Sequence, residues 1–262
     1  MKRLDLAYQE YGDPKKSLMV FLHGGGVSSW MWKKQVQHFT NYHCLTIDLP
    51  EHGASRNAGD FSILSSAEKI NEIIEEKRNR KKVIVIGFSL GAQVAIQMLS
   101  LKPNLIDYAI INSALVRPPS KAVRKMMRQS IYLSSSLVKS KAFAKLQAKT
   151  LYIGKDYFDT YYEESSQISA DTLIRIFDEN MSFKIPENFR DAKANILVTV
   201  GGNENSLMKR SAKELVKNHP NCTGINIPRV GHGISLHNPG FFNSLVENWL
   251  KDGSLPEEVI LL

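Results

Sequence analysis

Residues 82–96 constrain the fold of this chain more than any other stretch of its sequence. Four β-branched residues, 83–86, predict a strand that is buried on both faces. The sequence Gly-Phe-Ser-Leu-Gly follows at once at 87–91, and the apolar residues after it predict a largely buried helix. A serine between two such glycines, at a turn from strand to helix, can form a nucleophile elbow. Ser89 would then stand above the helix N-terminus, whose dipole favours negative charge nearby.

Buried strands alternate with helices along most of the chain. Besides the strand at 83–86, strands are predicted at 6–11, 18–22, 43–47, 106–111, 196–200 and 224–227. Helices are predicted at 28–39, 62–80, 92–99, 206–219 and 239–251. Repeated units of this kind indicate an α/β fold with a mostly parallel, doubly wound sheet.

The alternation stops after about residue 117 and resumes after about residue 190. This segment carries helical patterns and an aromatic-rich piece at 152–162. We expect a helical cap insertion at 117–190 over the carboxyl ends of the strands, where ligands bind in such sheets. Residues 1–116 and 191–262 would form the core beneath the cap.

The composition places the chain among globular proteins and excludes several classes. The 262 residues can bury a sizeable core, and no apolar stretch reaches membrane-spanning length, so no stable membrane insertion is expected. The first six residues contain no apolar run long enough for a signal peptide. The two cysteines, Cys44 and Cys222, indicate neither a disulfide framework nor a metal site. A cytoplasmic protein is the expectation.

The net charge of +8 is concentrated in one segment, because no acidic residue occurs between Ala114 and Lys155. One interpretation is a solvated face on the helices of the cap. The other is a field that attracts an anionic substrate or an anionic membrane surface. Nucleic acid is not an expected partner, since no recognition motif or aromatic stacking platform accompanies the charge. The segment's basic residues are Arg117, Lys121, Arg124, Lys125, Arg128, Lys139, Lys141, Lys145, Lys149 and Lys155.

A serine hydroxyl is a poor nucleophile at neutral pH unless a base lies within hydrogen-bond reach and a carboxylate orients that base. Of the seven histidines, His232 is the best candidate for the base. It lies between two glycines just after the last predicted strand of the core, at the same sheet edge as Ser89. His219 and His237 are expected at helix ends in contact with solvent.

Five motifs together resemble the α/β-hydrolase superfamily, and the resemblance covers nearly the whole chain. They are His-Gly-Gly-Gly at 23–26, Asp-Leu-Pro-Glu-His-Gly-Ala-Ser at 48–55, Gly-Phe-Ser-Leu-Gly at 87–91, Val-Gly-Gly-Asn-Glu at 200–204 and Gly-His-Gly at 231–233. Their order, nucleophile then acid then histidine, is the family's order. The chain therefore looks like a capped, cofactor-free serine hydrolase of the esterase type, which implies that no cofactor is needed.

The resemblance also implies the orienting acid. The family usually places an aspartate three residues after a glycine at the end of a late strand, and this chain has Glu204 three residues after Gly201. A glutamate can hold the imidazole and stabilise its charged form. Asp48, Asp171, Asp178 or no acid at all are the alternatives. The 48–55 motif carries Glu51 where the family usually has glycine, and this departure leaves the form of that loop open.

The same scheme predicts the groups that stabilise a developing oxyanion and those that bind substrate. The backbone N–H of Leu90 would pair with that of Gly25, with Gly26 as the next candidate. Phe88, Trp30 and Trp32 are expected to line an acyl pocket, although core packing is an equal alternative for Trp30.

The predicted function is therefore hydrolysis of a small carboxylic ester or thioester by Ser89, His232 and Glu204 through an acyl-enzyme. One alternative is cleavage of a carbon–carbon bond, or a related lyase step, in a carboxylate substrate that Arg124 and Arg128 would bind. Another is a non-catalytic homologue that binds a small ligand. No oligomeric state is predicted.

Overall fold

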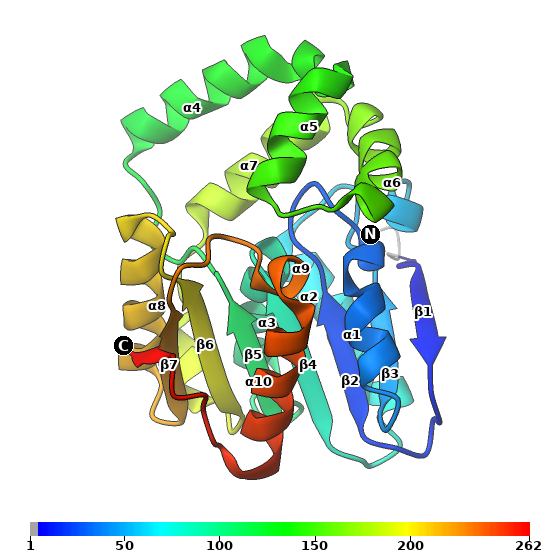
Figure 1. The fold of residues 1–262 in the computed structure, drawn as a ribbon, viewed down its shortest axis with the longest axis vertical. Helices are drawn as coiled ribbons and strands as arrows, with labels where there is room; N and C mark the ends of the chain where they lie inside the picture. Colours follow the sequence, from blue (N-terminus) through cyan, green and yellow to red (C-terminus); the bar gives the residue numbers. More distant parts are fainter. Residues whose placement is uncertain (1–4) are drawn as a thin grey trace.

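The sheet predicted from the buried strands is present in the computed structural model, which describes residues 5–262 (Figure 1). Residues 1–4, on which the prediction about a signal peptide partly rests, lie outside the described residues. The eight strands have the order β1-β3-β2-β4-β5-β6-β7-β8. They are β1 (Tyr8–Tyr11), β2 (Leu18–Leu22), β3 (His43–Ile47), β4 (Val83–Phe88), β5 (Tyr108–Asn112), β6 (Asn195–Gly201), β7 (Cys222–Ile227) and β8 (Ile260–Leu261).

Only the two edge strands run against their neighbours. β1 pairs antiparallel with β3 and β8 pairs antiparallel with β7, whereas the six strands between them are parallel. Val85, on the central strand β4, lies between Val20 of β2 and Ala109 of β5. The prediction of a mostly parallel α/β sheet is confirmed, and the short edge strand β8 is one that the sequence did not predict.

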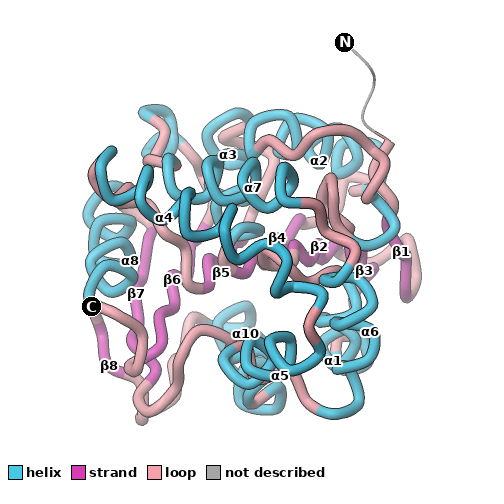
Figure 2. Tube along the Cα trace, turned by 90° about the horizontal axis from the view of Figure 1, so that it is seen from above, coloured by secondary structure: helices cyan, strands magenta, loops and turns pink. Residues whose placement is uncertain are grey.

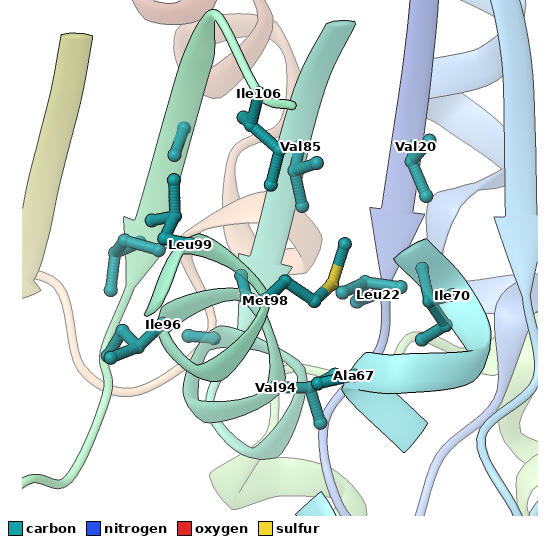
Figure 3. Close-up of a cluster of buried hydrophobic side chains, with 14 of the residues drawn as sticks. Val20, Leu22, Ala67, Ile70, Val85, Val94, Ile96, Met98, Leu99 and Ile106 are labelled. Atoms are coloured by element: carbon teal, nitrogen blue, oxygen red, sulfur yellow. The ribbon is translucent and has the colours of Figure 1, made fainter. Parts of the chain in front are cut away.

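The inner strands β2 to β6 are largely buried on both faces because helices cover both sides of the sheet (Figure 2). Val83 and Val85 point into a core with α2 (Ile63–Lys77), α3 (Leu90–Leu101) and α8 (Ser206–Asn218), part of which Figure 3 shows. Ile84 and Ile86 point to the other face, into a core with α1 (Lys33–His38) and α10 (Pro239–Asp252). Successive side chains of a strand point to opposite faces, so one apolar run supplies both cores.

Between β5 and β6 the chain forms helices that lie over the carboxyl ends of the strands (Figure 1). They are α4 (Lys121–Ser134), the short η3 (Ser135–Lys139), α5 (Lys141–Thr150), α6 (Lys155–Ser166) and α7 (Ala170–Ser182), followed by η4 (Glu187–Asp191). The aromatic-rich piece of the sequence forms α6. That these helices make up a separate cap domain stays a prediction, and "cap" is used below for α4 to α7.

Carboxylates of α6 and α7 bind groups in the loop after β2 and at the start of α2. Glu164 of α6 accepts hydrogen bonds from Ser28 Oγ at 3.0 Å and from Trp30 Nε1 at 2.9 Å. Glu179 of α7 accepts one from the backbone N–H of Ile63, at the start of α2, at 2.7 Å. Within residues 5–262, no helix is both long enough and apolar enough to cross a membrane.

Candidate active site

Ser89 occupies a sharp turn between β4 and α3. Its φ of 52° and ψ of −109° are unusual for a residue with a side chain. The two neighbouring glycines are required by space. A Cβ at Gly87 would lie 2.5 Å from the carbonyl oxygen of Gly91, and one at Gly91 would lie 2.4 Å from the carbonyl oxygen of Leu22. The elbow predicted from the Gly-Phe-Ser-Leu-Gly sequence therefore has the geometry that presents a side chain at the head of a helix.

A continuous hydrogen-bonded chain joins the three side chains that the sequence singled out. His232 Nε2 lies 2.9 Å from Ser89 Oγ, and His232 Nδ1 lies 2.7 Å from Glu204 Oε2. A carboxylate can only accept, so Nδ1 carries the proton and the Ser89 hydroxyl donates to Nε2. This arrangement can pass the serine proton to the imidazole and stabilise the charged ring that results.

Glu204 is held from three sides. Its Oε1 accepts hydrogen bonds from Ser113 Oγ at 2.6 Å and from the backbone N–H of Gly201 at 2.8 Å, while Oε2 accepts from His232. Burial by itself would raise the pKa of this carboxyl. The bonds from His232, Ser113 and Gly201 outweigh burial, and the pKa of Glu204 lies below its ordinary value. The side chain is therefore a fixed negative charge at neutral pH.

Ser113 was not identified from the sequence as part of the site. It follows β5 directly and has a left-handed φ of 56°. Because β5 and β6 are neighbours, the residue after β5 lies beside the loop that follows β6 and carries Glu204. Its position after a strand at the same sheet edge was the available signal.

The loop that carries His232 is held by close backbone contacts and by the cap. The backbone N–H of Gly231 donates to the hydroxyl of Tyr152 at 3.0 Å. A Cβ at Gly201 would lie 2.4 Å from the carbonyl oxygen of Gly231, so that loop packs directly on the end of β6. The Phe88 ring packs against the His232 ring, with the ring centroids 4.9 Å apart. Tyr152 is a second contributor that the sequence did not reveal.

A buried histidine shapes the glycine loop that follows β2. The backbone N–H of Leu49 donates to His23 Nε2 at 2.9 Å, so Nδ1 carries the proton and donates to the carbonyl of Gly24 at 2.7 Å. Burial lowers the pKa of His23, which keeps the ring neutral in this role. Gly25 and Leu90 then face the same cavity as Ser89. Leu90 begins α3, so its N–H has no carbonyl partner within that helix.

Ser89 lies where two cavities meet. The first, of about 510 Å³, is lined by Gly25, Gly26 and Leu90 and by mainly apolar side chains of the cap: Ile131, Val138, Phe143, Leu173, Ile176 and Phe177. The second, of about 550 Å³, lies on the side of His232 and Glu204 and has a mixed lining, in which Lys149 and Asn203 lie beside the apolar side chains of Leu115, Met181 and Met208. The two parts of a substrate on either side of a reacting carbonyl could thus be bound separately.

The three aromatic residues expected to line an acyl pocket lie elsewhere. Trp32 is fully buried in the core on the α1 and α10 side of the sheet, where its ring packs on Phe21 and Phe242. Trp30 binds Glu164 and stacks on Tyr157 of α6. Phe88 points to the same face of β4 as Ile84 and Ile86, beneath the glycine loop. Closeness in sequence to the motifs did not give the direction of these side chains, and none of them lines the two cavities at Ser89.

The alternative acids lie away from His232. Asp48 accepts hydrogen bonds from the backbone N–H groups of Ser29 and Ala54, both near 2.9 Å, as expected for a structural residue. Asp178 pairs with Arg128 at 3.1 Å. Asp171 lies in the first turn of α7.

Glu51, the departure from the usual motif, has a left-handed φ of 64°, the conformation that a glycine adopts most easily. Its carboxylate binds three groups: Arg175 Nε at 2.9 Å, Thr172 Oγ1 at 2.8 Å and the backbone N–H of Phe61 at 2.9 Å. Burial would raise the pKa of this carboxyl, but these bonds outweigh it and lower the pKa. Glu51 therefore links this loop to α7 of the cap.

Comparison with known proteins shows to which family the chain belongs. A profile of the alpha/beta hydrolase family matches residues 19–245. A Haemophilus influenzae protein with the provisional name esterase/lipase is 23% identical over 216 residues, which is 80% of this chain and 75% of the relative. A pimeloyl-[acyl-carrier protein] methyl ester esterase of Nitrosomonas europaea is 32% identical over 94 residues, 36% of this chain and 35% of the relative. The structure of MenH from S. aureus superposes with a TM-score of 0.75 and 19% identity over 94% of this chain and 98% of that one, which is a likeness of fold.

Proposed function

Because the chain belongs to the alpha/beta hydrolase family, we propose that it is a serine hydrolase that cleaves a carboxylic ester or thioester through an acyl-enzyme. One observation carries the proposal: the unbroken hydrogen-bonded chain from Ser89 through His232 to Glu204 beside an apolar cavity. The esterase names of relatives from Haemophilus influenzae and Nitrosomonas europaea support the same reaction class.

In the first half of the reaction, Ser89 Oγ attacks the substrate carbonyl while His232 Nε2 takes its proton. Glu204 stabilises the imidazolium, because its buried carboxylate stays charged. The negative charge that develops on the carbonyl oxygen is stabilised by the N–H groups of Leu90 and Gly25, with Gly26 next in the loop. Preorganised donors of this kind are each worth ~10²–10³ in rate.

In the second half, His232 gives its proton to the leaving group and then activates a water molecule that hydrolyses the acyl-enzyme. The leaving group departs on the side of His232, so it occupies the cavity of mixed lining next to Asn203 and Lys149. The acyl group occupies the apolar cavity under the cap. The best substrates would therefore have an apolar acyl part, while Lys149 and Asn203 could bind a polar group on the alcohol or thiol part.

A fluorophosphonate probe, combined with p-nitrophenyl esters of increasing acyl length, tests the proposal. The wild type is expected to be labelled and to hydrolyse the esters, whereas Ser89→Ala and His232→Ala lose both properties. Ser206→Ala and His38→Ala change residues of the same types at exposed positions away from the two cavities and are expected to behave like the wild type.

No labelling and no turnover by the folded wild type would contradict the proposal. Labelling of Ser89 without ester turnover would instead favour the carbon–carbon cleavage considered from the sequence. Rates that rise with acyl length and then fall would support the apolar cavity as the acyl site, because a cavity of about 510 Å³ limits the length of chain that it holds.

A further inference from the structure

The outermost helix of the cap carries an exposed apolar surface beside basic side chains. In Figure 1, α4 runs along the side of the cap that faces away from the sheet. Leu133 is 80% exposed, Met126 64% and Tyr132 61%. Five of the eleven exposed large apolar side chains in residues 5–262 belong to α4 and η3; they are Val123, Met126, Tyr132, Leu133 and Leu137. Together with Lys121, Lys125, Arg128 and Lys139 they are called the α4 surface below.

Helix geometry separates the two faces of α4. Met126 and Leu133 are seven residues apart and therefore lie on one row of the helix surface, while Lys121, Lys125 and Arg128, at spacings of four and three, form the row beside it. The opposite face carries Met127 and Ile131, which are half-buried, and Ile131 lines the apolar cavity at Ser89. The helix thus forms a wall of the acyl cavity on one side and the α4 surface on the other.

The charges of the α4 surface are only partly neutralised by neighbouring elements. Asp178 of α7 pairs with Arg128 at 3.1 Å. Across the described part of the chain, no carboxylate pairs with Lys121, Lys125 or Lys139. Residues 115–154 contain no acidic side chain at all. The surface therefore presents uncompensated positive charge next to exposed apolar side chains.

We propose that the α4 surface docks on the interface of an anionic lipid bilayer. A helix that lies in such an interface buries apolar side chains at the boundary between headgroups and acyl chains, while its basic side chains face anionic headgroups. Each lysine or arginine close to the surface strengthens binding by about fivefold, since it contributes about 1 kcal/mol. The apolar side chains distinguish this partner from a small anionic substrate, which needs charge but no exposed leucine.

Docking would bring the acyl cavity close to lipid. Ile131 and Val138 line that cavity from α4 and η3, the two elements that also carry the α4 surface. A lipid-borne acyl group would then have a short path under the cap to Ser89. Docking itself requires no hydrolysis, so the proposal goes beyond the proposed function and can fail or succeed independently of it.

Sedimentation of the whole protein with vesicles tests the proposal. The wild type and Ser89→Ala are both expected to bind phosphatidylcholine vesicles that contain phosphatidylglycerol. Both should bind pure phosphatidylcholine vesicles much more weakly, and both should dissociate from the anionic vesicles as salt is added. Lys121→Glu/Lys125→Glu and Met126→Ser/Leu133→Ser are each expected to reduce binding by about tenfold or more. These variants should keep the wild-type melting temperature and the turnover of a short soluble ester, because none of the four residues lines a cavity at Ser89.

Two matched controls lie outside the cap. Lys213→Glu/Lys217→Glu makes the same charge change on exposed positions of α8, and Leu261→Ser removes a leucine that is 68% exposed on β8. Both are expected to bind vesicles like the wild type. The proposal is overturned if the wild type does not bind anionic vesicles, or if the α8 charge change weakens binding as much as the α4 change. Binding to an acidic carrier protein without binding to vesicles would also overturn it, since the α4 surface would then serve a protein partner.

Discussion

The substitution Glu204→Gln tests the assignment of the acid most directly, because it removes one negative charge and keeps the size of the side chain. The structure determines how the new amide would lie. The backbone N–H of Gly201 can only donate, so the amide oxygen must take the place of Oε1, 2.8 Å from that N–H. The amide NH₂ group must then take the place of Oε2 and face His232.

An NH₂ group at that place reverses the roles of the imidazole nitrogens. It donates to His232 Nδ1, which must become the acceptor, so the single ring proton moves to Nε2. Nε2 then points an N–H at Ser89 Oγ, 2.9 Å away, and can no longer take the serine proton. The same inversion in a serine protease lowers kcat by about 10⁴, and we expect a loss of that order here, equivalent to about 5 kcal/mol.

Ser113→Ala provides a graded comparison. It removes one donor from Oε1 but leaves the Gly201 N–H and the negative charge of Glu204 in place. A hydrogen bond to a charged group is worth about 1.5–3 kcal/mol, and part of that energy affects catalysis through the position of the carboxylate. We therefore expect a loss of about tenfold in kcat, with little change in KM, far smaller than the loss in Glu204→Gln.

Turnover of a p-nitrophenyl ester, measured on protein with a wild-type melting temperature, checks both expectations. Asp178→Asn is the matched control, since it neutralises one of the alternative acids, which pairs with Arg128 instead of His232. Its rate should lie within about twofold of the wild type. A Glu204→Gln rate close to that of the wild type at every pH tested would refute the assignment of Glu204, and a large loss in Asp178→Asn would point to a different acid.

Three further predictions concern stability. Gly91→Ala should lower the free energy of unfolding by about 3 kcal/mol or more, because the new Cβ would lie 2.4 Å from a backbone oxygen. Gly154→Ala should change this free energy little, because no atom lies within 4 Å of the place of its Cβ. Thermal melts of both variants check this. Replacing Glu51 and Arg175 by alanine, singly and together, should reveal a coupling free energy of about 1 kcal/mol in denaturant unfolding. Because the pKa of Glu51 is lowered in the folded protein, this coupling should be complete above pH 4.5 and disappear as the pH falls further. Burial, with a smaller contribution from His23, lowers the pKa of His52 to about 3. Below pH 6.5 the unfolded chain therefore binds a proton that the folded chain excludes, and the free energy of unfolding should fall by up to about 1.4 kcal/mol for each unit by which the pH is lowered. Denaturant unfolding at several pH values checks this, and His52→Gln should reduce the slope.

The parts of the fold that could be predicted are those in which one residue pattern has one structural solution. The apolar run before Ser89 is buried on both faces, and both sets of its side chains find a core, Val85 on one side and Ile86 on the other. The glycines around Ser89 leave no alternative to the elbow, because backbone oxygens occupy the places where Cβ atoms would lie. Local sterics carried both predictions.

Other features depended on partners far away in the sequence. Tyr152 approaches the His232 loop from the cap, and no pattern around it indicates that its hydroxyl accepts from Gly231. The α6 helix contains few residues of high helix propensity, and tertiary contacts such as the stack of Tyr157 on Trp30 accompany it. Tertiary contacts of this kind cannot be predicted from the local propensity of a segment.

The position of Glu204 is understood only when the sequence and the structure are considered together. Glu204 follows the end of β6 by three residues, and Ser113 follows β5 directly. Those strands are neighbours, so Ser113 lies beside Glu204, which in turn binds His232. Here the longer glutamate takes the charge, and the serine of the other strand end donates to it at 2.6 Å. The longer side chain of Glu204 is therefore held by a donor from the neighbouring strand end while its other oxygen binds His232, which lies 2.9 Å from Ser89 Oγ.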